Sequence, residues 1–361
     1  MQPLTDDLLR WYRRERRAMP WRSDPTPYKV WISEIMLQQT QVATVVPYFE
    51  RWIEAFPDAL SLSQAPIDDV LAKWSGLGYY RRAHLIHRAA GLLVEKHGGQ
   101  LPRDLEALLA MPGVGRYTAG AIASIAFNLP APILDGNVMR VLSRVFIVEG
   151  NPRKGQANAR LWDLAQGLIP DGEARDFNQS LMELGALVCS PRKPDCQGCP
   201  ISDHCRAFAE DRVAALPELP KRKKKRPMFV ATALLSDGPA GQYLLVKRPS
   251  EGLFGGLFET PGVVLDGLPA PGEARRRLAE HLSSLGIEAT LDGKLEPVDH
   301  TLTHIQMKIQ PFTARLDSAR PRLGAGARWV RVDELDDQPL SSATRKVIAR
   351  LRAAAQGSLD F

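Results

Sequence analysis

MPGVGRYTAG, residues 111–120, is the stretch that decides how the first half of this chain folds. Apolar residues recur at helical spacing before it, in 104–110, and after it, in 117–127. Pro112 and Gly113 end the first helix, and glycine lets backbone approach a ligand closely. We therefore predict a helix, a tight turn and a second helix whose first amides can receive a phosphate oxygen. An ordinary pair of helices joined at a glycine is the alternative.

The length and composition are those of an ordinary globular protein with two domains. The chain has 361 residues, of which 44% are hydrophobic and 24% charged. Its 47 basic and 41 acidic residues give a net charge of +6, which is compatible with nucleic acid as a partner. No apolar run reaches the roughly 18 residues of a membrane span. The N-terminus lacks the apolar core of a signal peptide. We therefore expect a cytoplasmic protein, at the nucleoid if it is bacterial, with no membrane partner.

The chain changes character near residue 216. Residues 1–215 are nearly all helical in pattern, whereas 216–227, LPELPKRKKKRP, read as a proline-containing linker. The basic run of this linker, 221–226, either contacts DNA or is solvated. In 228–361 we expect strands and helices in the order 229–236 (strand), 242–248 (strand), 272–285 (helix), 304–313 (strand) and 341–354 (helix). The predicted fold is a mostly α first domain followed by an α+β domain.

All four cysteines lie in one short segment. Their spacing is C-x6-C-x2-C-x5-C, formed by Cys189, Cys196, Cys199 and Cys205. Four thiolates suit either zinc or an iron–sulfur cluster. Structural zinc sites usually pair their ligands in two short knuckles, and only one such pair is present here. The spacing therefore favours a [4Fe–4S] cluster over zinc.

Two acidic residues stand in apolar surroundings. Asp135 opens a helix in ILDGNVMRVL, where it and Asn137 can act simply as N-caps. We expect Asp135 to stay ionised, because a helix N-terminus favours an anion. Glu34 lies in a segment without another charge from Ile35 through Phe49, so its pKa should be raised.

In the non-catalytic interpretation, Glu34 lies with Gln38 and Gln41 on a solvent-exposed polar stripe of one helix over 28–46. In the catalytic interpretation, Glu34 is the protonated carboxyl and Asp135 the ionised one. A glycosidase uses such a pair, one carboxyl to protonate the leaving group and the other to stabilise the sugar cation or attack it. The sequence does not show that Glu34 and Asp135 meet.

Long motifs of this chain resemble the adenine DNA glycosylases of the MutY family, which are helix-hairpin-helix, iron–sulfur glycosylases. The resemblance covers most of residues 8–210. It rests on the four-cysteine loop and on TPYKVWISEIMLQQTQVATVVPYFERW (26–52), WSGLGYYRRA (74–83), MPGVGRYTAGAI (111–122), ILDGNVMRVL (133–142) and FNQSLMELGALVC (177–189). More loosely, 228–361 resembles the Nudix-like module of that family through KRPSEGLFGGLFETPG (247–262) and HTLTH (300–304).

The resemblance implies excision of adenine mispaired with 8-oxoguanine or guanine, after the adenine has been flipped out of the duplex. It implies that Glu34 protonates the adenine at N7 and that Asp135 stabilises the sugar cation, through a covalent intermediate. Asn137 and Tyr117 would orient Asp135 and the sugar. Contacts to the flipped adenine are implied for Arg17, Trp21, Arg22 and Gln179.

The resemblance also implies the contacts to DNA. Gln39 and Tyr79 would wedge into the base stack beside the lesion, and Gly113, Val114, Gly115 and Arg116 would hold a phosphate of one strand. A lesion-recognition loop is implied at Leu302, Thr303 and His304, where the family has Phe-Ser-His. The acids after Gly262 do not reproduce the metal-binding spacing of Nudix hydrolases, so we expect no pyrophosphatase activity. The implied protein is a monomer that binds duplex DNA and holds a [4Fe–4S] cluster.

Tyr117 separates this reading from its closest alternative. Related endonuclease III-type enzymes carry a lysine at the matching place, and its amine forms a Schiff base with the sugar and nicks the strand. Tyrosine cannot do this, so we expect base removal without efficient strand nicking. The alternatives are such a bifunctional glycosylase/lyase and a non-enzymatic iron–sulfur DNA-binding regulator. A regulator would need neither Glu34 nor Asp135 in its motif.

Overall fold

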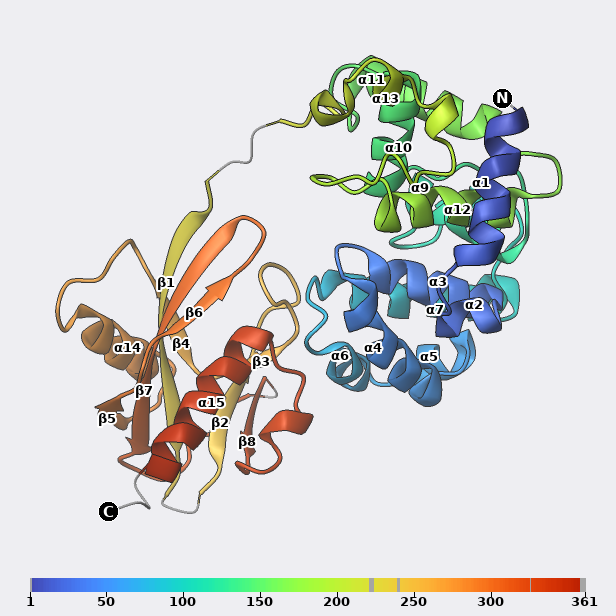
Figure 1. Ribbon diagram of the computed structural model, residues 1–361. Helices are drawn as coiled ribbons and strands as arrows, with labels where there is room; N and C mark the ends of the chain where they lie inside the picture. Colours follow the sequence, from blue (N-terminus) through green and yellow to red (C-terminus); the bar gives the residue numbers. More distant parts are fainter. Residues whose placement is uncertain (1, 221–223, 239–240, 325, 358–361) are drawn as a thin grey trace. The chain divides into compact units, whose positions relative to one another are not determined.

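The computed structural model describes residues 2–220, 224–238, 241–324 and 326–357 (Figure 1). The chain forms two units. One comprises Met1–Gln64 and Leu85–Lys221, and the other comprises Ala65–His84 and Arg222–Phe361. Residues 65–84, which precede the predicted linker, thus group with the second unit. Residues 221–223 of the basic run lie outside the described part of the chain.

The first unit is helical, as predicted. Its core is built mainly from α1, α10, α11 and α12, whose buried apolar side chains form one cluster. No helix among the described residues is long and apolar enough to cross a membrane. Helix α7 begins inside the 65–84 segment and continues into the first unit. The helices are α1 (Gln2–Glu15), α2 (Pro20–Ser23), α3 (Pro27–Leu37), α4 (Val42–Ala55), α5 (Ala59–Gln64), α7 (Arg81–His97), α8 (Leu105–Leu109), α9 (Arg116–Ala121), the π-helical η1 (Ile122–Ala126), α10 (Gly136–Phe146), α11 (Gly155–Gly167), α12 (Ala174–Leu187) and α13 (Arg206–Ala209).

The prediction of one helix over 28–46 is wrong. Helix α3 ends at Leu37, and α4 starts at Val42 with Gln41 in the N-cap position. Between them Gln39 takes a left-handed backbone conformation with φ 59°, which no α-helix accommodates. The expected polar stripe through Glu34 therefore does not form, and Glu34 is instead buried on α3. The interruption turns Gln38–Gln41 into a loop.

The turn in MPGVGRYTAG has the predicted helix–turn–helix form, with α8 before it and α9 after it. Gly113 has φ 80°, and a Cβ there would lie 2.8 Å from the Cβ of Leu85. Gly115, the N-cap of α9, has φ −94°, and a Cβ there would point into open space. Only Gly113 is required by backbone geometry and packing. Gly115 leaves room for a ligand, such as the predicted phosphate, to approach the N-terminus of α9.

The second unit is built on a mixed sheet. The main strand order is β3-β2-β1-β7-β5, with β4 on β1, β6 on β7 and β8 on β2. Strands β1 and β7 are parallel, and the other pairs are antiparallel. The elements are α6 (Ile67–Trp74), β1 (Arg226–Ser236), β2 (Tyr243–Lys247), β3 (Phe258–Glu259), β4 (Gly262–Leu265), α14 (Glu273–Ser284), β5 (Ala289–Lys294), β6 (Val298–Thr301), β7 (Ile305–Leu316), β8 (Ala327–Val330) and α15 (Ser342–Gly357).

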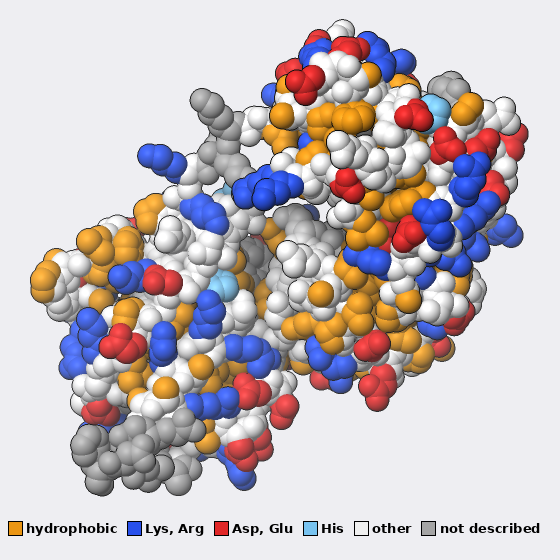
Figure 2. Space-filling view, viewed as in Figure 1, with side chains coloured by type: hydrophobic (Ala, Val, Ile, Leu, Met, Phe, Trp, Pro, Cys, Tyr) orange, Lys and Arg blue, Asp and Glu red, His pale blue; other side chains and the backbone are white. Residues whose placement is uncertain are grey.

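Alternate residues of the central strands feed two cores, because successive side chains point to opposite faces. One core packs against α14 and the other against α15. This is the predicted α+β domain, so the predicted fold class is confirmed for both halves of the chain. On the face of the molecule in Figure 2, basic side chains are spread over both units and interspersed with acidic ones.

Candidate active site

One open cleft of about 2120 Å³ in the first unit gathers most of the residues singled out in the sequence. Glu34 and Asp135, which are 101 positions apart, both line it. The other predicted residues on its wall are Arg17, Trp21, Arg22, Gln39, Tyr117, Asn137 and Gln179. The cleft is formed by α2, α3, α9, α12 and the start of α10. The fold therefore brings both carboxyls to one place, which the sequence alone did not show.

Glu34 sits on α3 with 5% of its surface exposed. The pKa of its carboxyl is raised to about 7, mainly because the side chain is buried; the charge of Asp135 adds to the rise, and a hydrogen bond from Tyr117 opposes it. The Tyr117 hydroxyl donates to Glu34 Oε2 over 2.7 Å. The structure thus joins Tyr117 to the acid rather than to Asp135. Such a carboxyl is half protonated near neutral pH and can donate a proton there.

Asp135 is the N-cap of α10. Its Oδ1 accepts from the backbone N–H of Val138 over 2.7 Å, and its Oδ2 accepts from Asn137 Nδ2 over 2.9 Å. The capping role is therefore real, and Asn137 does contact Asp135. Burial raises the pKa of Asp135, and these donors oppose it. The pKa of Asp135 is thus raised overall, because burial outweighs the capping hydrogen bonds on which our expectation of an ionised Asp135 rested. The donors nevertheless favour the anion on Asp135, and Asp135 in turn favours the proton on Glu34.

Glu183 on α12 is a site residue that the sequence reading missed. Its buried carboxylate accepts from Arg17 Nε at 2.8 Å and from Arg17 Nη2 at 2.9 Å, and Arg22 Nη2 donates to it at 3.0 Å. Burial opposes ionisation of Glu183, but the hydrogen bonds from the two arginines prevail and lower its pKa to about 2. Arg22 also donates to Gln179 Oε1 over 3.0 Å. The signal that could have identified Glu183 is its place as a lone acid in the apolar helical segment SLMELGALV.

The ion pairs give the cleft a fixed polar wall. Because Glu183 holds Arg17 and Arg22, the guanidinium groups keep their positions without a ligand. Trp21 packs edge-on against Phe49, with ring centroids 5.3 Å apart. An aromatic ring, two held cations and an amide line one side of the cleft, an arrangement that suits a flat, hydrogen-bonding base.

Tyr79 and the predicted lesion loop belong to the second unit. Tyr79 is 44% exposed and has a left-handed backbone with φ 49°. Its hydroxyl is hydrogen-bonded to the hydroxyl of Thr303, in the turn between β6 and β7. Thr303 and His304 are exposed, whereas Leu302 is partly buried and packs against the core under α15. The leucine that replaces the family phenylalanine thus contributes to the core.

The hairpin residues divide between packing and exposure. Val114 is buried, whereas Gly115 and Arg116 are exposed at the start of α9. The Arg116 guanidinium lies 3.9 Å from the centroid of the Trp162 ring. A cation stacked in this way keeps its N–H edge free for an anion. The geometry is compatible with a phosphate at the turn.

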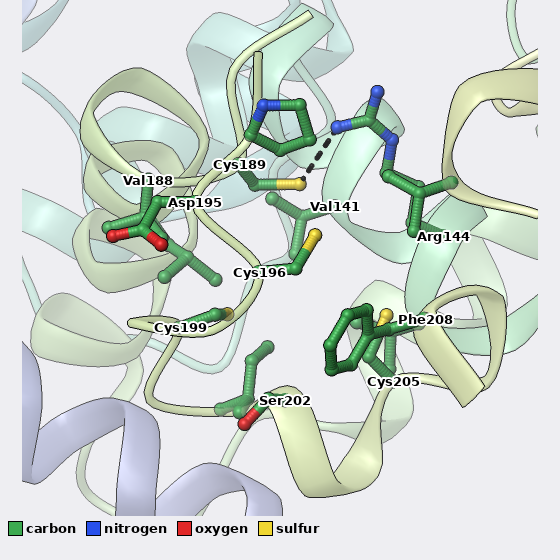
Figure 3. A pocket seen from close by; sticks show the side chains of 15 residues that line it. Val141, Arg144, Val188, Cys189, Asp195, Cys196, Cys199, Ser202, Cys205 and Phe208 are labelled. Atoms are coloured by element: carbon green, nitrogen blue, oxygen red, sulfur yellow. Dashed lines mark hydrogen bonds between the residues drawn. The ribbon is translucent and has the colours of Figure 1, made fainter. Parts of the chain in front are cut away.

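The four cysteines line one hollow of about 390 Å³ together with Val141, Arg144 and Phe208 (Figure 3). Arg144 Nη1 donates to Cys189 Sγ over 3.3 Å. Among the described residues, no three His, Cys, Asp or Glu side chains already surround the position of a single metal ion. Four sulfurs around an apolar hollow, with a cation on one of them, fit an iron–sulfur cluster.

Arg140 connects this centre to the cleft. Its Nε donates to the carbonyl of Cys189 over 2.7 Å, and its Nη2 donates to Asn137 Oδ1 over 2.9 Å. Asn137 in turn donates to Asp135. The Arg140 side chain thus links the backbone of Cys189 to Asn137, the residue that donates a hydrogen bond to Asp135.

Comparison with known proteins agrees with both halves of the fold. Residues 32–166 match the model of the HhH-GPD superfamily base excision DNA repair protein, 189–205 the iron–sulfur binding domain of endonuclease III, and 231–350 the NUDIX domain. An adenine DNA glycosylase of Rattus norvegicus is 37% identical, covering 94% of this chain and 76% of that protein. For the adenine DNA glycosylase of Homo sapiens the identity is 36%, covering 94% and 72%. The solved structure of a thermostable thymine-DNA glycosylase is similar, with a TM-score of 0.54, 31% identity, and coverage of 58% of this chain and 96% of that one.

Proposed function

This chain belongs to the adenine DNA glycosylase family and is a DNA N-glycosylase of base-excision repair, and from that premise we propose its substrate and mechanism. The substrate is duplex DNA in which an adenine stands opposite 8-oxoguanine or guanine. The enzyme flips this adenine into the cleft of the first unit and hydrolyses its N-glycosidic bond. Its cofactor is a [4Fe–4S] cluster, held by Cys189, Cys196, Cys199 and Cys205.

The observation that carries the mechanism is the pairing of Glu34 and Asp135 in one cleft, with the proton favoured on Glu34. Glu34 protonates the adenine at N7, so that the base leaves as a neutral molecule. Asp135 stabilises the positive charge that develops on the sugar and then forms a covalent bond to it, which water hydrolyses. Asn137 positions Asp135, and Tyr117 positions Glu34.

The polar wall of the cleft supports adenine as the base that is recognised. Arg17, Arg22 and Gln179 present hydrogen-bonding groups, and Glu183 fixes both guanidinium groups. Trp21 supplies an aromatic face. Because these groups are held before the base arrives, little ordering is needed when it enters.

The absence of an amine supports a monofunctional enzyme. A Schiff base to the sugar requires a primary amine. Among the described residues that line the cleft, none is a lysine, and Tyr117 contacts Glu34 at the place where the endonuclease III type has one. We therefore favour base removal alone over the bifunctional glycosylase/lyase.

The remaining residues hold the DNA. We propose that a phosphate of one strand binds at Gly113, Val114, Gly115 and Arg116. Gln39 fills the space that the flipped base leaves in the stack. Tyr79, Thr303 and His304 contact the base opposite the flipped adenine. The hydrogen bond between Tyr79 and Thr303 supports the proposal that these residues act together in recognising that base. The [4Fe–4S] cluster, when bound, holds the 189–205 loop in shape. We further propose that the protein acts as a monomer and in the cytoplasm.

A single-turnover assay tests this proposal. Duplexes with one adenine opposite 8-oxoguanine, guanine or thymine are incubated with excess enzyme, and strand breaks are counted with and without alkali. We expect alkali-dependent breaks at the adenine, fastest opposite 8-oxoguanine and slowest opposite thymine. Breaks without alkali would refute the monofunctional assignment. Equal rates for the three partners would refute lesion recognition.

A further inference from the structure

The predicted wedge residue, Tyr79, lies in a turn of the second unit whose internal shape is fixed. We call residues 75–80 the wedge turn. Gly78 and Tyr79 both have left-handed backbones, with φ 74° and 49°. The carbonyl of Gly78 accepts from Trp74 Nε1 and from Arg82 Nη2, each over 3.1 Å, and both donor side chains are buried. A left-handed tyrosine persists only where its surroundings hold it, so Tyr79 moves only if the wedge turn moves.

Ser75, at the start of the wedge turn, attaches it to helix α15 and to the chain just before that helix. The buried Ser75 hydroxyl donates to the carbonyl of Leu340 over 2.6 Å and accepts from Arg345 Nη2 over 3.0 Å. Arg345, on α15, also donates to the carbonyls of Asp336 and Gln338, over 3.0 and 3.2 Å. Because Ser75 is buried, water does not readily replace the hydrogen bonds that it makes. One guanidinium group thus holds the wedge turn on α15.

Leu340 connects the wedge turn to the predicted lesion loop. Its side chain is buried in the core under α15, and Leu302 packs against the same core. Thr303 follows Leu302, and its hydroxyl is hydrogen-bonded to the hydroxyl of Tyr79. The core thus holds the lesion loop, and Arg345 holds the wedge turn beside the same core. The position of Tyr79 relative to Thr303 depends on both.

We propose that Arg345 is a positioning residue that sets the preference for 8-oxoguanine over guanine opposite the adenine, an inference that rests on the proposed lesion recognition. Arg345 holds the wedge turn where Tyr79 and Thr303 reach the opposite base together. Contacts that must form at once require a well-defined geometry, and a misplacement of about 1 Å can lower a rate about a hundredfold. Guanine has neither the oxygen at position 8 nor the hydrogen at N7 that distinguish the lesion. Excision of adenine opposite guanine therefore depends less on this geometry.

A second attachment keeps residues 65–84 on the sheet when Arg345 is replaced. Asp68, on α6, accepts from Lys247 Nζ over 2.6 Å and from Arg328 Nη2 over 2.9 Å. The described residues that line the catalytic cleft do not include Arg345. Replacing Arg345 should therefore loosen the wedge turn without detaching the segment and without touching the catalytic groups.

Single-turnover excision of adenine opposite 8-oxoguanine and opposite guanine tests this role, with the ratio of the two rates as the readout. Arg345→Met should lower this ratio about tenfold, through slower excision opposite 8-oxoguanine. The rate opposite guanine should stay within about twofold of the wild type. Arg345→Lys should restore part of the ratio, because an ammonium group can still donate to Ser75.

The matched control is Arg352→Met. Arg352 is on the same helix, and its guanidinium donates to the Asp336 carboxylate and to the carbonyl of Val332 rather than to the wedge turn. Its ratio should equal that of the wild type. Ser75→Ala keeps every charge in place and should lower the ratio in the same way, even if Arg345→Met fails to fold.

A double variant tests whether Arg345 acts through the lesion loop. Thr303→Ala alone should lower the ratio, and adding Arg345→Met to it should change the ratio by less than about twofold, because both residues act on the same geometry. Losses that multiply in the double variant would overturn the role of Arg345.

The outcomes separate this inference from the proposed function. Equal wild-type rates opposite the two bases would refute the proposed lesion recognition, and this inference with it. If the wild type prefers 8-oxoguanine but Arg345→Met and Ser75→Ala keep that preference, only the role of Arg345 is overturned. The same holds if these variants slow both substrates equally, since that is the result of a merely structural role.

Discussion

Among single residues, Glu34 has the largest functional consequence of burial. Its carboxyl is almost without solvent, and its pKa of about 7 leaves it partly protonated at neutral pH. The sequence identified this residue because its neighbours carry no charge. It did not identify Glu183, whose role depends on two arginines more than 150 positions earlier in the chain. A pattern along the chain reports local surroundings and not distant partners.

Glu34 should cost the protein stability at neutral and alkaline pH. Its pKa rises on folding from 4.5 to about 7, so the folded state is penalised as pH rises from 4.5 through 7. Glu34→Gln removes this penalty. We expect its free energy of unfolding to exceed that of the wild type by up to about 3 kcal/mol at pH 8 and by little at pH 4.5. Urea unfolding at both pH values measures this, and an equal gain at both would contradict the assigned shift.

Tyr117→Phe should change the pH dependence of excision. The hydroxyl of Tyr117 lowers the pKa of Glu34 by donating to its ionised form. Without it, the pKa of Glu34 rises, and the alkaline limb of the rate profile should move to higher pH by up to about one unit. Single-turnover rates from pH 6 to 9 measure this. A limb that moves to lower pH, or that stays in place while the rate falls, would mean that the hydroxyl serves another group.

At the scale of elements, two turns position the site, and the sequence predicted one of them. The hairpin between α8 and α9 was predictable because Pro112 and Gly113 stop a helix by their own chemistry. The break between α3 and α4 was not, since glutamine and threonine are tolerated in helices. There, tertiary structure holds Gln39 in a left-handed conformation that its sequence does not demand. That break puts Gln39 on the wall of the cleft.

The two hairpin glycines should fail in different ways. Gly113→Ala meets Leu85 and an unfavourable φ, so it should lower the free energy of unfolding by about 1–3 kcal/mol. Gly115→Ala, the matched control, points its methyl into open space and should change stability by under about 0.5 kcal/mol. It should instead weaken DNA binding about tenfold by obstructing the phosphate. Urea unfolding and DNA titration separate the two effects. Equal DNA affinity of Gly115→Ala and the wild type would remove the phosphate from this turn.

For the whole molecule, composition and periodicity predicted a helical half and an α+β half, and both are present. The cysteine spacing predicted the iron–sulfur centre because ligand spacing is a local property. The grouping of 65–84 with the second unit was not predictable, since it rests on contacts with residues that lie more than 150 positions later. The meeting of Glu34 and Asp135 was likewise a property of the fold.

Removal of the cluster should affect the two units unequally. All four cysteines and the arginines that contact their loop belong to the first unit. Because ligand binding contributes to folding stability, cluster removal by a chelator under oxidising conditions should lower the unfolding temperature of the first unit. The transition of the second unit should stay where it is. Differential scanning calorimetry before and after removal, with iron content as the control, measures both. An equal fall in both transitions would contradict this division.

The most direct test of the central claim, that Glu34 supplies the proton for adenine excision, is the single-turnover rate between pH 5.5 and 9. Adenine opposite 8-oxoguanine serves as substrate, with enzyme in excess. We predict a rate constant that is level below about pH 7 and falls about tenfold per pH unit above it, because only protonated Glu34 donates. Glu34→Gln should lower the rate at pH 7 by about a hundredfold or more while DNA binding persists. A wild-type rate that is level up to pH 9, or a Glu34→Gln variant that excises adenine at the wild-type rate, would contradict the claim.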